Sequence, residues 1–500
     1  MHTILDTICD RELSYQQKVH ALARDAEATL DVLPIPDAAR DLLERGVICD
    51  LFEGHAPWRP RYIIPDYGRF MHQGSDFLRI SPPRTLMEAI HALLALYHHV
   101  PSITNFPVWI GDIDTLLEPF VEAEPRAGEI IGHFLDHIDR TLNDSFCHAN
   151  IGPFATQAGR IILRHQRMAS NAVPNMSIKY DPETTPEDFA LEAVLTSLAT
   201  AKPSFAHHPR FRDEFNSAGY EHYAIASCYN GLPVRGGSTT LVRLNLARLA
   251  ETARDRDDLL TRALPDAVSA MLALMDVRVD FLVTRSGFFE SSFLVREGLI
   301  EFSRFTGMFG VVGLAECVNR HFAKDSGGTV FGHNDLADAF GIEIIRRIDA
   351  AVRSHRAPHL TAFGGRYQLH AQVGIDSDVG VSPGCRIPIG DEPELMEHLV
   401  RSAPFHAFFP SGIGDVFAFE PTAKNNPGHI LDIIRGAFAS GVRYLSLYAS
   451  DADVVRITGY LVKRSELARL NRGEAVLQDT TALGRGAINN LRVLDRKLRS

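Results

Sequence analysis

Cysteine is the residue type in this sequence with the widest choice of chemistry, because a thiol can act as nucleophile, metal ligand or hydrogen-atom relay. The chain has 500 residues and six cysteines, which is too few for a disulfide scaffold. They form no C-x-x-C pair, the spacing typical of a zinc or iron-sulfur site. We therefore expect reduced thiols, one of which can have a chemical role, among Cys9, Cys49, Cys147, Cys228, Cys317 and Cys385.

A glycine near the end of the sequence lies in the segment Arg456-Ile457-Thr458-Gly459-Tyr460. A radical on a glycine Cα is stabilised jointly by the flanking amide nitrogen and carbonyl, and only glycine lets that centre flatten without a side-chain clash. The segment resembles the R-V-x-G-Y signature of glycyl radical enzymes, with Ile in place of Val. The resemblance implies that Gly459 stores a radical and that Arg456, Thr458 and Tyr460 are motif residues. The alternative is a glycine in a tight turn that requires a positive φ.

A buried glycyl radical needs a second residue to relay the hydrogen abstraction, and a cysteine is suitable because its S–H bond is close in strength to the glycyl C–H bond. Three segments resemble, in this order, the anaerobic ribonucleotide reductases: 227–231 (Ser-Cys-Tyr-Asn-Gly), 235–237 (Arg-Gly-Gly) and the strand-like 240–250. These reductases are a branch of the glycyl radical superfamily, and residues 305–316 continue the resemblance. By this match Cys228, which lies 231 residues before Gly459, is the thiyl candidate.

Two other cysteines compete for the relay role. Cys317 follows a glycine-containing loop and is the alternative thiyl candidate, and Cys385 lies in a Ser-Pro-Gly-Cys-Arg segment that imitates a reductase motif. Their order relative to the other motifs does not match. The simpler interpretation of both is a buried thiol that packs as a small apolar residue.

Differences from the known branches of the glycyl radical enzymes narrow the choice of branch for this sequence. Pyruvate formate-lyase carries adjacent cysteines, which this chain lacks, and the diol and choline eliminases carry G-C-x-E where this chain has Asn230 after Cys228 and Asn319 after Cys317. Anaerobic ribonucleotide reductases carry a C-terminal cysteine-rich zinc site, whereas no cysteine follows Cys385. The chain instead resembles the compact YjjI-type glycyl radical enzymes from about Arg59 onward. Ribonucleotide-reductase-like activity remains an alternative.

This resemblance implies an α/β fold, a ten-stranded barrel of two parallel half-sheets around the cysteine loop, with a helical N-terminal region and a C-terminal glycyl radical domain. It implies an anaerobic, cytoplasmic, oxygen-sensitive enzyme of lyase or oxidoreductase type acting on a small polar metabolite. A partner, a radical-SAM activating enzyme with S-adenosylmethionine and a [4Fe-4S] cluster, installs the radical, while this chain binds no cofactor or metal. A homodimer is implied, and residues after about Tyr448 swing out during activation.

Polar residues beside the motifs are candidates for substrate binding or acid–base chemistry. The principal ones are Asn230, Arg235, Glu316 and Asn319, with Glu316 as a general base and Arg235 as a clamp for a carboxylate or phosphate. The alternatives are surface ion pairs and loop hydrogen bonds. Further polar residues near these motifs are His333, Asn334 and Asp335. His133 and His137 form a histidine pair without a third metal ligand, and we expect both to face solvent.

Two rival functions remain open. The first is polar chemistry on an α/β barrel, in which Cys228 is a nucleophile and His222 or His208 its base. The second is a non-catalytic protein that retains the radical motif without turnover.

The elements that must position these residues alternate between strand and helix patterns after residue 220, which favours a parallel α/β architecture. The predicted strands are 240–246, 277–283, 309–314, 367–373 and 442–448, and the predicted helices include 14–30, 391–400 and 430–438. We divide the chain into a mainly helical part (1–200), a barrel core with the cysteine loop (201–447) and a glycyl radical segment (448–500).

Composition excludes several classes of protein. The chain is 45% hydrophobic and 23% charged, as ordinary globular proteins are. Its formal net charge of -11 gives no attraction to nucleic acid or anionic lipid. The most apolar stretch, 267–283, is interrupted by Asp276, Arg278 and Asp280, so we expect no membrane span, and we expect no signal peptide.

Overall fold

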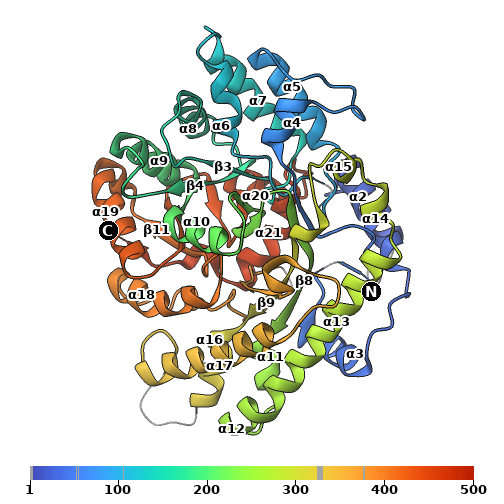
Figure 1. The fold of residues 1–500 in the computed structure, drawn as a ribbon. Coiled ribbons are helices and arrows are strands. Elements are labelled where there is room, and N and C mark those ends of the chain that lie inside the picture. The colour runs from blue at the N-terminus through green and yellow to red at the C-terminus, as the bar shows by residue number, and fades with distance from the viewer. Residues whose placement is uncertain are drawn as a thin grey trace.

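Two large β-sheets form the centre of the molecule, and helices surround them (Figure 1). The computed structural model describes residues 4–51, 53–54, 56–104, 106–323, 330–375 and 378–499. Strands from both sheets are buried along their whole length, as expected of a sheet covered on both faces.

The first sheet has five strands in the order β1-β8-β9-β10, with β2 also paired to β8. β8, β9 and β10 are parallel, whereas β1 and β2 pair antiparallel with β8. The bounds are β1 (Ile48–Cys49), β2 (Tyr62–Ile64), β8 (Gly236–Asn245), β9 (Phe305–Val312) and β10 (Gln368–Ala371).

The second sheet has six strands in the order β15-β11-β12-β5-β4-β3. β3, β4 and β5 are mutually parallel, β12 pairs antiparallel with β5, and β11 is parallel to both β12 and β15. The bounds are β3 (His148–Ile151), β4 (Asn175–Tyr180), β5 (Ser204–His207), β11 (Asp415–Phe419), β12 (Tyr444–Ala449) and β15 (Leu498–Arg499).

Two short hairpins carry the residues of greatest chemical interest. The hairpin β6 (Tyr223–Ala226) and β7 (Asn230–Pro233) turns at residues 227–229, which include Cys228. The hairpin β13 (Val454–Arg456) and β14 (Leu461–Lys463) turns at residues 457–460, which include Gly459. Each residue is therefore at the tip of a hairpin rather than within a large sheet.

Helices cover the sheets on the outside. Those that precede the cysteine hairpin are α1 (Ile4–Cys9), α2 (Tyr15–Ala28), α3 (Asp37–Glu44), α4 (Tyr67–Gln73), α5 (Leu86–Tyr97), α6 (Ile113–Leu117), α7 (Ala127–Thr141), α8 (Gln157–Ala169), α9 (Glu187–Thr200) and α10 (His208–Ser217). The others are α11 (Leu246–Ala250), α12 (Arg256–Asp258), α13 (Leu264–Thr284), α14 (Phe288–Ser291), α15 (Phe293–Arg296), α16 (Leu314–Phe322), α17 (Asp335–Ser354), α18 (Leu395–Ser402), α19 (Pro427–Ala439), α20 (Arg464–Leu470) and α21 (Asp479–Asn490).

Most of the predicted elements are present. The predicted strands 240–246, 309–314, 367–373 and 442–448 overlap β8, β9, β10 and β12, and the predicted helices overlap α2, α18 and α19. Ser14 caps α2 in a reciprocal pair of hydrogen bonds with Gln17, as its sequence indicates. Residues 1–200 supply strands to both sheets, β1 and β2 to the first and β3 and β4 to the second.

The predicted strand at 277–283 is wrong. These residues form the end of α13, whose buried side chains recur every three or four positions, among them Met271, Met275, Val279 and Leu282. A short apolar run does not distinguish a buried strand from a buried helix. No helix in the described part of the chain is both long and apolar enough to cross a membrane.

Candidate active site

The tips of the two hairpins touch. A Cβ atom built on Gly459 would lie 2.0 Å from Cys228 Cβ, 3.1 Å from Cys228 Cα and 2.5 Å from Val373 Cγ1. Because one Cα–H bond of a glycine points along this direction, a hydrogen of Gly459 points at the Cys228 side chain. The φ of Gly459 lies outside the left-handed region, so the turn does not require glycine. Its close approach to Cys228 does.

The Cys228 thiol is buried, with 1% of the residue exposed. Its Sγ lies 3.3 Å from Asn230 Nδ2, which donates to it, and 3.9 Å from His370 Nε2. Burial raises the pKa of Cys228 above its ordinary value, so the thiol keeps its hydrogen at neutral pH. A hydrogen-atom relay needs this form, whereas a nucleophile needs the thiolate.

The bases required by the nucleophile hypothesis lie elsewhere. His208 Nδ1 is 2.8 Å from Tyr223 Oη, and His222 is exposed. The imidazole beside the thiol is that of His370, and burial lowers its pKa to about 3, which makes it a weak base. The geometry therefore does not favour a nucleophilic Cys228.

Polar side chains of the second sheet hold the cysteine hairpin. His148 Nδ1 donates to the carbonyl of Ser227 at 2.7 Å, and Asn150 bonds both the N–H and the carbonyl of Ile225 at 2.8 Å. Tyr444 Oη donates to the carbonyl of Cys228 at 3.5 Å. Side chains from β3 and β12 thus fix the backbone on both sides of the thiol.

A buried arginine and an asparagine hold the glycine hairpin. Asn175 Nδ2 donates to the carbonyl of Gly459 at 2.9 Å and reaches that of Ser227 at 3.5 Å. Arg456 Nη2 donates to Asn175 Oδ1 at 2.9 Å and to the carbonyl of Ala201 at 2.9 Å. Asn175, on β4, therefore joins the two hairpins and is itself oriented by the motif arginine.

The C-terminal residues cover the same hairpin from the other side. Arg496 donates to the carbonyls of Arg456 and Ile457, and β15 follows directly. Burial lowers the pKa of Arg456 to about 10, so this guanidinium stays charged at neutral pH although all its hydrogen-bond partners are neutral oxygens.

The other two motif residues, Thr458 and Tyr460, are buried. Thr458 is buried, and its hydroxyl has no hydrogen-bond partner among the described residues. The ring of Tyr460 is fully buried and lies 5.2 Å from that of Phe146.

Of the four predicted substrate-binding or acid–base residues, the structure places Asn230 next to the thiol. Arg235 forms an ion pair with Glu301 at 3.4 Å, which is the simpler alternative considered for it. Glu316 accepts a hydrogen bond from Ser382 Oγ at 2.6 Å, and burial raises its pKa.

The remaining polar candidates stabilise loops or caps. Asn319 Oδ1 accepts from the N–H of Phe331 at 2.8 Å, and Asn334 caps α17. His333 Nε2 donates to the carbonyl of Asp391, and Asp335 pairs with Arg401 at 3.1 Å. None of these contacts involves Cys228 or Gly459.

The alternative thiols and the histidine pair also occupy ordinary positions. Cys317 lies in α16 and Cys385 in the loop after β10, both within a cluster of buried apolar residues. Burial raises the pKa of Cys317 to about 12. His133 is 76% exposed, and no group of three or more metal-binding side chains occurs among the described residues.

Sequence reasoning missed His370, Asn175 and His148. His370 lies in a segment correctly predicted as a strand, in which Gln368, His370 and Gln372 occupy every second position. Polar residues at every second position of an otherwise apolar strand are a signal for an interior polar face. The sequence of this strand contains that pattern, but the pattern does not tell which cysteine thiol the polar face contacts.

This chain is similar to known proteins over nearly its whole length. A family model described as glycyl radical enzyme YjjI-like matches residues 13–499. The chain belongs to this family. An uncharacterized protein of Haemophilus influenzae (strain KW20 / Rd) is 43% identical over 505 residues, which cover 100% of this chain and 98% of that protein. YjjI of Escherichia coli (strain K12) is 43% identical over 489 residues, 97% of this chain and 94% of YjjI.

Solved structures show the same fold at low sequence identity. Hydroxyproline dehydratase from Clostridioides difficile matches with a TM-score of 0.68 and 11% identity, covering 100% of this chain and 89% of that one. The anaerobic ribonucleotide reductase of Thermotoga maritima matches with a TM-score of 0.66 and 13% identity, covering 86% and 85%. The B12-independent glycerol dehydratase of Clostridium butyricum gives 0.66 and 12%, covering 97% and 86%. The predicted glycyl-radical-type α/β fold is thereby confirmed, but its two large sheets have five and six strands instead of ten in all, and both contain antiparallel pairs.

Three buried histidines predict how the stability of this YjjI-like enzyme depends on pH. Burial lowers the pKa of His148, His370 and His406 from 6.5 to about 3. The unfolded chain therefore binds more protons, and the stability these groups contribute is present above pH 6.5 and lost as the pH falls towards 3. Each histidine contributes a loss of about 1.4 kcal/mol per pH unit within that range, and two buried carboxyls whose pKa burial raises to about 7, Asp114 and Asp144, offset part of it, so we expect a net fall. Urea unfolding at pH 7.5, 6, 5 and 4 measures it, and a free energy of unfolding that stays level contradicts it.

Removing Asn175 should loosen the glycine hairpin. In Asn175→Ala the carbonyl of Gly459 loses its 2.9 Å donor and Arg456 loses an acceptor. We expect amide hydrogen exchange in residues 456–461 to be about tenfold or more faster, since one lost buried hydrogen bond costs roughly 1–3 kcal/mol. Exchange mass spectrometry on the unactivated protein measures it. Asn150→Ala is the matched control, because Asn150 holds the cysteine hairpin at Ile225. Equal protection of residues 456–461 in both variants would refute this role.

Proposed function

We propose that this chain stores a radical on Gly459 and uses a Cys228 thiyl radical to abstract hydrogen from a small polar metabolite. The family membership supports radical chemistry. The observation that carries the residue assignment is the contact of the two hairpins, where a Cβ on Gly459 would lie 2.0 Å from that of Cys228. The raised pKa of Cys228 supports the same assignment, because it preserves the S–H bond.

The relay conserves hydrogen and spin. The Gly459 radical takes the hydrogen of the Cys228 thiol, which regenerates the glycine C–H bond and leaves a thiyl radical. The thiyl takes a hydrogen from a substrate C–H bond, and the substrate radical is converted to a product radical. The product radical recovers a hydrogen from the thiol, and the thiyl returns the radical to Gly459. The protein contributes the alignment of the thiol and the exclusion of water.

Activation requires an external reaction at Gly459. We propose that a radical-SAM activating enzyme removes one Cα hydrogen, using S-adenosylmethionine and a [4Fe-4S] cluster on that partner. Since Gly459 is packed against Cys228 and Val373, the hairpin of β13 and β14 must leave this position first. The hydrogen bonds that Asn175 and Arg496 make to the hairpin then break. We further propose that the enzyme is a homodimer of the anaerobic cytoplasm.

Anaerobic activation followed by electron paramagnetic resonance tests this function. With its cognate activating enzyme the chain should give a doublet, because one hydrogen remains on the Gly459 Cα. Admission of air should then cut the backbone at Gly459 into a long N-terminal and a short C-terminal fragment, which mass spectrometry identifies. A competent activating enzyme that gives neither doublet nor cleavage would falsify the radical assignment.

A further inference from the structure

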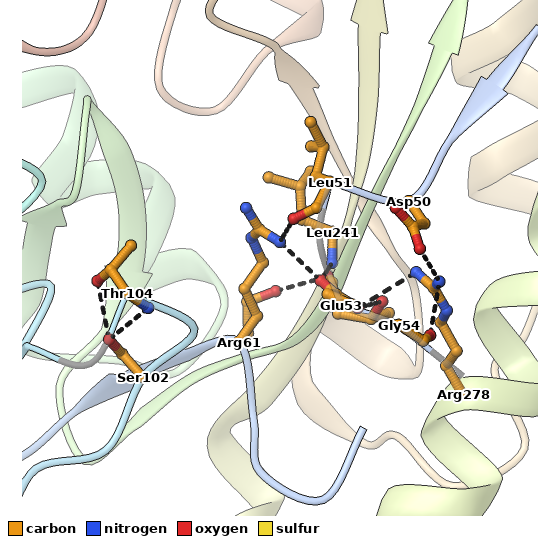
Figure 2. Close-up of polar contacts among 11 residues, drawn as sticks. Asp50, Leu51, Glu53, Gly54, Arg61, Ser102, Thr104, Leu241 and Arg278 are labelled. Atoms are coloured by element: carbon orange, nitrogen blue, oxygen red, sulfur yellow. Dashed lines mark hydrogen bonds and ion pairs between the residues drawn. The ribbon is translucent and has the colours of Figure 1, made fainter. Parts of the chain in front are cut away.

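The buried arginines of the molecule differ in whether a carboxylate forms an ion pair with them. Figure 2 shows Glu53 between Arg61 and Arg278, with Asp50 beside Arg278. The two positive charges of this cluster are thus matched by two negative ones. Glu53 also accepts from Thr240 Oγ1 and from the N–H of Leu241, which fixes it in place.

Arg386 has no carboxylate ion-pair partner among the described residues. It is 6% exposed, and its Nε donates to the carbonyl of Ile413 at 2.9 Å, while Nη2 donates to Tyr229 Oη at 3.0 Å. Among the described residues no carboxylate lies within ion-pair distance of it. Asp415 is close enough for their charges to interact, but its Oδ1 lies 3.7 Å from His398 Nε2. An unpaired buried guanidinium is costly unless an anion completes the site.

The loop before Arg386 brings this residue to the thiol. Gly384 has a φ of 53°, and a Cβ there would lie 2.9 Å from Ala371 Cβ, so the loop folds directly onto β10. Tyr229, which follows Cys228 in the chain, contacts Arg386, and its ring centroid lies 5.2 Å from that of His370. Arg386 is therefore linked to Cys228 Sγ through Tyr229 and then His370.

Two residues that contact the thiol, and a third that lies two positions after His370, have a polar atom without a hydrogen-bond partner among the described residues. Asn230 Oδ1, His370 Nδ1 and Gln372 Oε1 are buried without a partner among the described residues. Each residue is at least nine-tenths buried, and Asn230 and His370 contact Cys228 Sγ. Two of these atoms are acceptors, which a hydroxyl group of a ligand can satisfy.

We propose that Arg386 binds the anionic group of the substrate, and that this substrate is a small hydroxylated carboxylate or phosphate ester. The inference rests on the proposed function, because it treats Cys228 as the group that meets the substrate. The anion pairs with Arg386, and a hydroxyl donates to Asn230 Oδ1. This arrangement places a hydroxyl-bearing carbon and its C–H bond beside the thiol.

Binding to the unactivated, anaerobic protein tests the proposal without any radical. The probes are glycerate and glycerol 3-phosphate, with glycerol as the neutral analogue. At 10 mM we expect the anions to raise the thermal midpoint by about 2 °C or more, and glycerol to leave it unchanged. Arg386→Gln should abolish the shift. Equal shifts with glycerol, or no shift with either anion up to 50 mM, would overturn the proposal.

Two further variants keep the result interpretable. Arg366 lines a separate cavity of about 500 Å³ together with Arg353, so Arg366→Gln should retain the anion shift. Loss of the shift in Arg366→Gln would move the anion to that cavity and refute the site at Arg386. If Arg386→Gln does not fold, Arg386→Lys keeps the charge and should bind about tenfold more weakly. A glycyl doublet without anion binding refutes only this inference, and anion binding without a doublet refutes only the proposed function.

Discussion

Gly459→Ala should give no glycyl doublet after anaerobic activation, no backbone cleavage in air and no turnover. Two physical effects act together at this position. An added methyl group would keep the Cα centre from flattening within the packed hairpin. It would also lie 2.0 Å from Cys228 Cβ, a separation that the two hairpin backbones must move apart to relieve. We expect activity to fall at least about 10⁴-fold and the thermal midpoint to fall as well.

A glycine in open space provides the matched control. Gly436 lies in α19, and a Cβ built there meets no atom within 4 Å. Gly436→Ala should keep the doublet, the cleavage and the activity, with a small gain in stability from its helix propensity. A doublet of normal intensity in Gly459→Ala would assign the radical to another residue.

Cys228→Ser should separate radical storage from turnover. The hydroxyl is nearly isosteric with the thiol, so the bonds to the neighbouring backbone from His148 and Tyr444 remain. An O–H bond is much stronger than an S–H bond, so the glycyl radical cannot oxidise serine. We expect a persistent doublet on Gly459 and a loss of turnover on the order of 10⁴-fold or more.

Deuterated buffer gives this variant a spectroscopic signature. A thiol exchanges its hydrogen with solvent, and the relay then passes deuterium to the Gly459 Cα. The wild-type doublet should collapse in D₂O, while that of Cys228→Ser should persist. Cys317→Ala is the matched control, because its thiol is buried among apolar side chains, and it should behave like the wild type. Collapse of the doublet in Cys228→Ser would show that another group exchanges hydrogen with Gly459.

We expect activation to require the glycine hairpin to leave its packed position and to break the hydrogen bonds that hold it. Asn175 is the side chain that contacts both hairpin tips, and Arg496 bonds the carbonyls at residues 456 and 457. Variants of these two residues should therefore change activation more than they change the chemistry at Cys228. The exchange experiment on Asn175→Ala measures the same opening in the absence of the activating enzyme.

Local sequence determined much of this protein. The five residues around Gly459 carry the radical motif, and the order of the segments near residues 228, 240 and 305 indicates the family that the comparisons confirm. Strand and helix periodicity located β8, β9, β10 and β12, because each depends on neighbours within a few residues. The same method failed at 277–283, where the apolar run is too short to distinguish the two periods.

Only the tertiary structure decided which side chains surround the two hairpin tips. Asn175 lies 284 positions from Gly459, and His370 lies 142 from Cys228, yet both pairs are in contact. Sequence proximity instead favoured Arg235, Glu316 and Asn319, whose contacts are an ion pair with Glu301 and hydrogen bonds with Ser382 and with the N–H of Phe331. A period-two pattern tells that a residue faces the interior, but the partner it meets there depends on how two sheets and two hairpins pack. Backbone propensity acts over a few residues, whereas the site is assembled by packing across the whole chain.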